Sequence, residues 1–140
     1  RLAVGAPMND GNGSESGHTR VYQWSGSAWM QLGADIDGEA SGDYSGWSVS
    51  LSSDGNRLAI GAPWNRRSAG HARVYQWSGA TWVQLGADID GEAANDYSAL
   101  VSLSSDGNRL AIGASGNDGN GDNQVRVFRG KVLFRRVDQR

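Results

Sequence analysis

Two short segments of the chain concentrate carboxylates at the same spacing. In each, an Asp-x-Asp-Gly-Glu stretch is followed four residues later by another aspartate; the eight side chains are Asp35, Asp37, Glu39, Asp43, Asp88, Asp90, Glu92 and Asp96. Calcium takes about six to eight oxygen ligands, which carboxylates can supply. The spacing is not that of an EF-hand loop, so these side chains could instead cap backbone N–H groups in a turn. Calcium is therefore a possible cofactor of these segments.

Two further polar segments, Asn9–Gly13 and Asn117–Asp122, are rich in glycine and could also collect oxygen ligands. The corresponding place in the middle of the chain holds Asn65-Arg66-Arg67 and no ligand set, which favours a plain turn. Asn12 begins Asn12-Gly13-Ser14, an acceptor sequence for N-glycosylation that is used only in a secreted protein of a eukaryote.

No combination of nucleophile and base stands at a unique position in the sequence. The two histidines, His18 and His71, occupy equivalent places in a repeated segment. They could converge from neighbouring repeats, but a surface or hydrogen-bonding role is favoured. Because a catalytic site requires a specific constellation and would break the symmetry of a repeat, we expect a protein that is not an enzyme.

Tryptophan is the other residue type that suggests a binding role. Trp24 and Trp29 return as Trp77 and Trp82, which indicates packing between repeats rather than a platform for carbohydrate. Trp47 and Trp64 have no counterpart in the other units and are the better candidates for a contact surface.

The elements that carry these residues are repeated. Arg1–Pro7 returns as Arg57–Pro63 and as Arg109–Ser115, and Gly17–Trp24 returns as Gly70–Trp77. The resulting units are 1–56, 57–108 and an incomplete 109–140. They differ in length in a loop at 8–20 and by one residue near Trp47, as expected if insertions are confined to loops.

Each unit reads as four strands, of which one set is Trp47–Ser52, Arg57–Ala62, Ala72–Trp77 and Thr81–Leu85. Asp54-Gly55 supplies the positive φ of a two-residue turn between the first two strands. No window has a sustained 3.6-residue apolar period, so we expect no helix. Because the strands are partly apolar on both faces, each sheet should pack between two neighbours. The predicted fold is all-β: a β-propeller segment of about two and a half to three four-stranded antiparallel blades.

These segments resemble FG-GAP repeats, the units of the integrin α-subunit propeller and of many secreted proteins. Ser45-Gly46-Trp47-Ser48-Val49 stands for the first element of that pattern, Gly61-Ala62-Pro63 for its Gly-Ala-Pro, and Gly70–Tyr75 for its last strand. The resemblance implies a secreted or cell-surface module. Members of the family bind calcium at the first hairpin, but Ser52–Asn56 retains too few carboxylates for that site.

Composition and charge restrict the partners. The 140 residues contain no cysteine, no signal peptide is visible, and no apolar run is long enough to cross a bilayer. The sequence starts within a repeat, so a leader could have been removed or lie outside it. Most acidic residues precede position 125, and a basic stretch follows, in which Arg135 and Arg136 are candidate contact residues. The acidic body argues against nucleic acid.

We therefore expect an extracellular structural or adhesive module that contacts other protein chains. The partner would be a further copy of the chain, in an oligomer or filament, or a cell-surface protein or glycan. The alternative is a propeller module that binds calcium or a glycan, as a lectin does.

Overall fold

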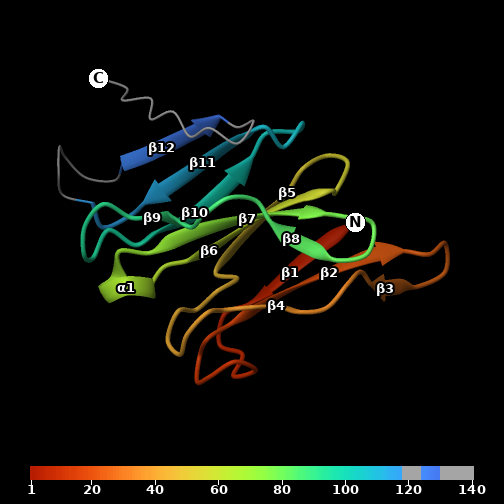
Figure 1. The fold of residues 1–140 in the computed structure, drawn as a ribbon, viewed down its shortest axis with the longest axis horizontal. Coiled ribbons are helices and arrows are strands. Elements are labelled where there is room, and N and C mark those ends of the chain that lie inside the picture. The colour runs from red at the N-terminus through yellow and green to blue at the C-terminus, as the bar shows by residue number, and fades with distance from the viewer. Residues whose placement is uncertain (118–123, 130–140) are drawn as a thin grey trace.

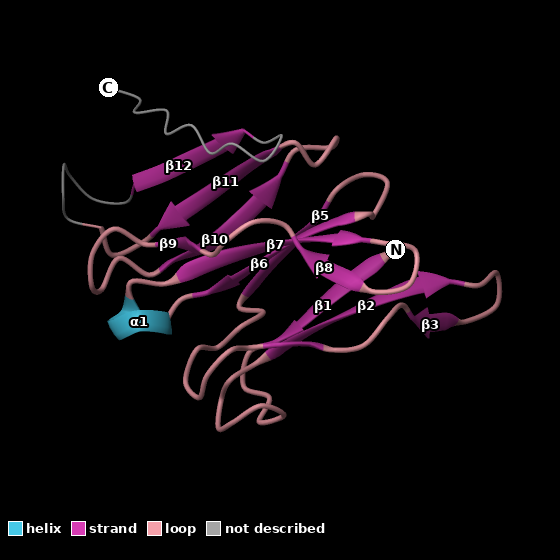
Figure 2. Ribbon diagram, viewed as in Figure 1, coloured by secondary structure: helices cyan, strands magenta, loops and turns pink. Residues whose placement is uncertain are grey.

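The computed structural model describes residues 1–117 and 124–129 and contains three antiparallel sheets (Figures 1 and 2). The first sheet comprises β1 (Leu2–Ala6), β2 (His18–Trp24), β3 (Trp29–Gln31) and β4 (Ile36–Asp37). The second comprises β5 (Ser48–Leu51), β6 (Arg57–Ala62), β7 (His71–Trp77), β8 (Trp82–Gln84) and β9 (Ile89–Asp90). The third comprises β10 (Ser98–Leu103), β11 (Arg109–Ala114) and β12 (Gln124–Arg129). The all-β architecture of antiparallel, blade-like sheets agrees with the sequence prediction, and the sheets do not close into a ring.

The second sheet is the most complete blade. Its strands follow one another in the order β5-β6-β7-β8, as predicted. The fourth position is interrupted, because β8 pairs with one end of β7 and β9 pairs with the other. The sequence analysis did not predict β9 or its counterpart β4, since two-residue strands leave no recognisable apolar alternation.

Two local features differ from the prediction. The β5–β6 connection is not a two-residue turn: Leu51 and Leu58 form the last pair, and four residues separate Ser52 from Arg57. Only Gly55 has positive φ, at 65°, so the segment cannot adopt the tighter turn, which needs positive φ at two successive residues. A single helical turn, α1 (Asn65–Ser68), connects β6 to β7 and is too short to produce a periodic apolar pattern.

The second sheet packs between the other two, as its two-sided apolar pattern predicted (Figure 1). Leu58, Ile60 and Tyr75 point to the first sheet and meet Val21 and Ile36 there. The opposite face of the same strands contributes Ala59 and Ala72, which pack with Val101, Leu110 and Ile112 of the third sheet. At both junctions, the leucine and isoleucine of the Leu-Ala-Ile strand face the preceding blade.

Glycine allows the sheets to approach closely at Gly61. A Cβ built at this residue would lie 1.8 Å from the carbonyl oxygen of Ala99, at the start of the next blade. The first strand of that blade, β10, also donates hydrogen bonds to β5, from the Val101 and Leu103 amides to the hydroxyls of Ser48 and Ser50. The repeated Gly-Ala and Ser-x-Ser elements therefore mark contacts between blades.

The sheets do not coincide with the sequence units. Strand β5 belongs to unit 1–56 but pairs with β6 of unit 57–108. In the described residues, the first sheet has no strand beyond β1 and the third has none beyond β12. None of the helices described has the length and apolarity required to span a membrane.

Candidate functional site

The eight predicted carboxylates lie in and around β4 and β9 and in the turns that follow these strands. Within the described residues, two groups place three potential ligand atoms within 4.8 Å of one another. One contains His18, Asp35 and Asp37, and the other contains Glu39, His71 and Asp88. Asp43, Asp90, Glu92 and Asp96 belong to neither group. The four carboxylates of each segment therefore do not form one cluster of potential ligands.

Asp43 and Asp96 are buried in the turns and accept hydrogen bonds from the chain itself. Asp43 accepts from the Ala40 amide at 3.0 Å and from the Asn65 side chain at 3.0 Å. The carboxylate of Asp96 accepts from the amides of Glu92 and Ala93 at 3.1 and 2.9 Å. This is the turn-capping geometry that the sequence analysis weighed against calcium. Calcium binding by the two segments stays a prediction.

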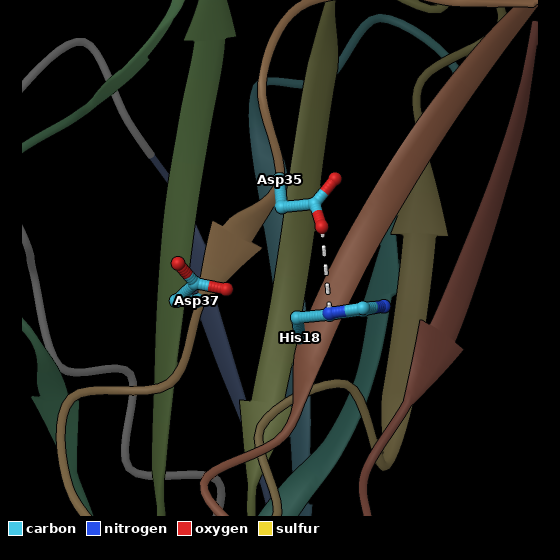
Figure 3. A group of neighbouring side chains, drawn as sticks. All are labelled: His18, Asp35 and Asp37. Atoms are coloured by element: carbon cyan, nitrogen blue, oxygen red, sulfur yellow. Dashed lines mark ion pairs between the residues drawn. The ribbon is translucent and has the colours of Figure 1, made fainter. Parts of the chain in front are cut away.

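Asp35 is held by an arginine of its own sheet. The Arg20 guanidinium donates two hydrogen bonds of 2.8 Å, one to each carboxylate oxygen. This hydrogen bonding is the main cause that lowers the pKa of Asp35 to about 2. Figure 3 shows His18 beside the same carboxylate, with the Nδ1 atom 3.6 Å from Oδ2. The Asp35 carboxylate is therefore already neutralised by Arg20.

The equivalent residues of the second sheet are arranged differently. Arg73, the counterpart of Arg20, is buried and turns toward the first sheet, where it donates to the Asp37 carbonyl at 2.8 Å and to Ser45 at 3.3 Å. Asp88, the counterpart of Asp35, accepts from Gln84 at 2.8 Å. The two histidines occupy equivalent positions but lie in different surroundings. Within the described residues, the first sheet covers one face of the second sheet, whereas no sheet covers the same face of the first.

The histidine of the second sheet is His71, which is 1% exposed. Burial, and then the charge of Arg73, lower its pKa, so the imidazole is neutral near pH 7. Neither ring nitrogen has a hydrogen-bond partner in the part of the chain that the structure describes. Of the roles considered for the histidines, a surface position is therefore wrong for both, since His18 is also buried.

The glycine-rich segment Asn9–Gly13 is organised by its own side chains. Asn9 accepts from the Gly11 amide, and Asp10 accepts from the Glu15 amide, both at 2.8 Å. Asn12 is exposed and donates from its side-chain amide to the Gly38 carbonyl. Its glycosylation stays a prediction. The corresponding segment Asn117–Asp122 lies outside the described residues after Asn117.

Trp47 and Trp64, the predicted contact residues, lie side by side and are 47% and 38% exposed. Their ring centroids are 5.0 Å apart, and Trp64 is also 4.7 Å from Tyr44 and 6.0 Å from Tyr97. Tyr44 and Tyr97 both have positive φ, which brings equivalent tyrosines of two repeats to one tryptophan. The four rings form an aromatic cluster. The sequence pointed to its two tryptophans but not to its two tyrosines, because the tyrosines come from a turn with no strand pattern.

The first sheet carries a larger exposed apolar surface on the side away from the second sheet. Leu2 and Val4 are each 45% exposed, whereas their equivalents Leu58 and Ile60 are 0% and 1% exposed. Trp24 and Trp29 are likewise half exposed and contact each other, with ring centroids 5.5 Å apart, so their packing against another blade stays a prediction. We call these four residues the open face of the first sheet.

Trp82, the equivalent of Trp29, packs against a neighbouring sheet. It packs against the core between the first two sheets, and its indole N–H donates to the Leu32 carbonyl of the first sheet at 3.0 Å. The predicted packing role is therefore confirmed for Trp82. No described residue packs in this way against the equivalent Trp29, because no sheet precedes the first one in the described part of the chain.

The third sheet is open on the opposite side. Leu100, Val125 and Val127 are 52%, 68% and 42% exposed, and we call them the open face of the third sheet. Val125 and Val127 occupy the places of Ala72 and Val74, which face the third sheet from the second. The candidate contact residues Arg135 and Arg136 lie outside the described residues.

Comparison with known proteins supports the repeat assignment. No curated protein sequence matches the chain. The family model described as the FG-GAP repeat matches residues 34–75. The matched segment runs from the turn before β4, through the β5–β6 hairpin, to Tyr75 in β7, and so includes the motifs on which the resemblance was based. Residues 34–75 of this chain are therefore similar to an FG-GAP repeat, which is consistent with the resemblance seen in the sequence.

Proposed function

We propose that the chain is a non-catalytic, extracellular repeat module that assembles with protein chains carrying the same type of blade, including further copies of itself. The observation that carries this proposal is the exposure of Leu2 and Val4 at positions that are buried in the next repeat. An extracellular setting is supported by the FG-GAP repeat, which occurs in extracellular proteins.

The two open faces are complementary halves of a contact that the chain makes twice internally. Inside the molecule, the face with Leu58 and Ile60 packs on Val21 and Ile36 of the preceding blade, and the face with Leu110 and Ile112 packs on Ala59 and Ala72. The open face of the first sheet holds the equivalents of Leu58 and Ile60, and that of the third sheet holds Val125 and Val127, the equivalents of Ala72 and Val74. A second copy could therefore stack its first sheet on the third sheet of its neighbour. Such a head-to-tail contact either closes into a ring or continues as a filament.

Sedimentation velocity of the 140-residue chain over a range of concentrations tests this proposal. We expect association that weakens on dilution and is abolished by Val4→Glu, because a carboxylate would be buried without a partner at the contact. Met8→Glu is the matched control, since Met8 is 68% exposed but lies in the loop after β1, outside the open face. A chain that stays monomeric at high concentration, or associates equally well as Val4→Glu, would overturn the proposal.

The aromatic cluster favours glycan binding as a second function. Exposed faces of Trp47 and Trp64 can stack on the apolar faces of sugar rings, as rigid aromatic surfaces do at other interfaces. Neutral oligosaccharides should change the tryptophan fluorescence of the chain, and Trp64→Ala should remove that change while Trp24→Ala retains it. A response that survives Trp64→Ala would rule out this cluster as the site.

A further inference from the structure

The junction between the first two sheets brings together three side chains with metal-binding atoms. Glu39 comes from the turn after β4, whereas His71 begins β7 and Asp88 precedes β9. One ligand atom of each lies within 4.8 Å of the other two. Because Glu39 belongs to the first sheet's turn and the other two residues to the second blade, anything bound here would connect two repeats.

The imidazole of His71 supplies an independent sign that this junction holds a ligand. The side chain is 1% exposed, and its two ring nitrogens have no hydrogen-bond partner among the residues that the structure describes. An imidazole buried in this way loses its hydrogen bonds to water, which costs about 1–3 kcal/mol for each unsatisfied group. Since nearly all buried polar groups in proteins are satisfied, the exception calls for a partner.

The chemistry of the three residues points to a particular class of cation. One neutral imidazole nitrogen and two carboxylates are ligands of Zn²⁺, whereas calcium takes oxygen ligands only. Three protein ligands leave a fourth tetrahedral position for water. The Glu39 side chain is 45% exposed, which gives an ion access from solvent.

We propose that Glu39, His71 and Asp88 bind a zinc ion that fastens the first repeat to the second. Ligand atoms at the usual zinc distance of about 2.0–2.2 Å lie roughly 3.4 Å apart in a tetrahedron. The three atoms must therefore approach by at most about 1.4 Å, a movement that the exposed Glu39 side chain can make.

The neighbouring contacts leave the ligands available. Asp88 uses Oδ1 to accept from Gln84, so its second oxygen can face the ion. Arg73 is anchored on the Asp37 carbonyl and on Ser45, and its Nη1 atom is 3.9 Å from Glu39, beyond hydrogen-bond distance.

The equivalent group of the first repeat lacks this availability. In the group of His18, Asp35 and Asp37 (Figure 3), both oxygens of Asp35 accept from Arg20. A cation would have to displace a bidentate ion pair there. The chain thus contains its own comparison: an equivalent histidine and aspartate in each repeat, with the arginine on the aspartate in one repeat and turned away in the next.

Calorimetric titration of the metal-free 140-residue chain with ZnCl₂ tests the proposal. We expect one saturable site, a higher Tm in zinc because the ion binds only the folded chain, and little response to CaCl₂. Glu39→Gln and His71→Gln should each weaken zinc binding at least tenfold. Asp37→Asn is the matched control, since it removes an exposed carboxylate from the other group and should leave the affinity unchanged.

Cobalt provides a second readout that does not depend on stability. Co²⁺ bound in a tetrahedral site with a nitrogen ligand should give intense visible absorption bands that zinc displaces. If His71→Gln fails to fold, the exposed Glu39→Gln variant still decides the matter. The absence of saturable zinc binding, or binding that Glu39→Gln leaves intact, would overturn the proposal.

Discussion

Truncation of two equivalent leucines measures how much the stacking of the sheets contributes. Leu58 and Leu2 follow an arginine and precede Ala-x-Gly-Ala in the same repeated segment. Leu58 is 0% exposed between the first two sheets, whereas Leu2 is 45% exposed on the open face. Leu58→Ala and Leu2→Ala therefore make the same chemical change in the same strand position and differ in the presence of a covering blade.

The burial of each residue sets the expected cost. Replacing a fully buried leucine by alanine lowers the free energy of unfolding by about 3–5 kcal/mol, because apolar contact is lost and a cavity remains. The three carbons removed are worth about 2.4 kcal/mol when fully buried. At Leu2 roughly half of that applies, and solvent fills the space, so we expect about 1 kcal/mol. The difference between the variants is then at least about 2 kcal/mol.

Urea unfolding followed by tryptophan fluorescence measures this difference. With a slope of roughly 2 kcal/mol per molar urea, Leu58→Ala should lower the midpoint by about 1.5–2.5 M and Leu2→Ala by about 0.5 M. The measurement belongs at low protein concentration, where association through the open face adds nothing to stability. Equal midpoints for the two variants, with unchanged slopes, would refute the blade stacking described above.

Three further predictions concern the close contact between blades, the hairpins and the acidic segments. Gly61→Ala should destabilise the chain more than Gly113→Ala, as judged by Tm, because its Cβ would meet backbone at 1.8 Å rather than a side-chain atom at 3.3 Å; an equal loss would contradict the close approach. The Ser104 hydroxyl donates to Asp106 and is the main cause that lowers the pKa of this carboxyl from 3.8 to about 2. Because the folded chain holds the more acidic group, its contribution to stability is complete above about pH 4 and is lost as the pH falls to 2, so Asp106→Asn should reduce the pH dependence of the urea midpoint in this range; an unchanged dependence would assign acid unfolding to other groups. Adding CaCl₂ to the metal-free chain should leave the Tm unchanged, because the buried aspartates of both acidic segments already accept backbone N–H groups; a rise of several degrees would show that calcium is bound as well.

Local sequence was sufficient for the strands and for the repeat. The Val-Tyr-Gln-Trp and Leu-Ala-Ile-Gly-Ala segments predicted β7 and β6 because strand propensity and turn residues act within a few positions of each other. The two-residue strands β4 and β9 and the four-residue hairpin were not predictable in this way. They depend on which backbone groups of the longer strands remain free to pair.

The candidate sites were likewise predictable only in part from the sequence. The sequence identified Trp47 and Trp64 as departures from the repeat. The structure places their rings in direct contact and adds Tyr44 and Tyr97, which both contact Trp64. It also grouped the carboxylates by their spacing along the chain. The structure regroups them across the blade junction, since Glu39 meets His71 and Asp88, which are more than thirty positions away.

The sequence by itself determined that this protein is a repeat of antiparallel strands with apolar residues on both faces, and that residues 34–75 resemble an FG-GAP repeat. Only the tertiary structure decided which members of each equivalent pair are buried. Leu2 and Leu58, or Trp29 and Trp82, have the same local sequence and the same strand position. Their burial differs because it depends on whether another blade covers that face, and this is a property of the stack that no single repeat encodes.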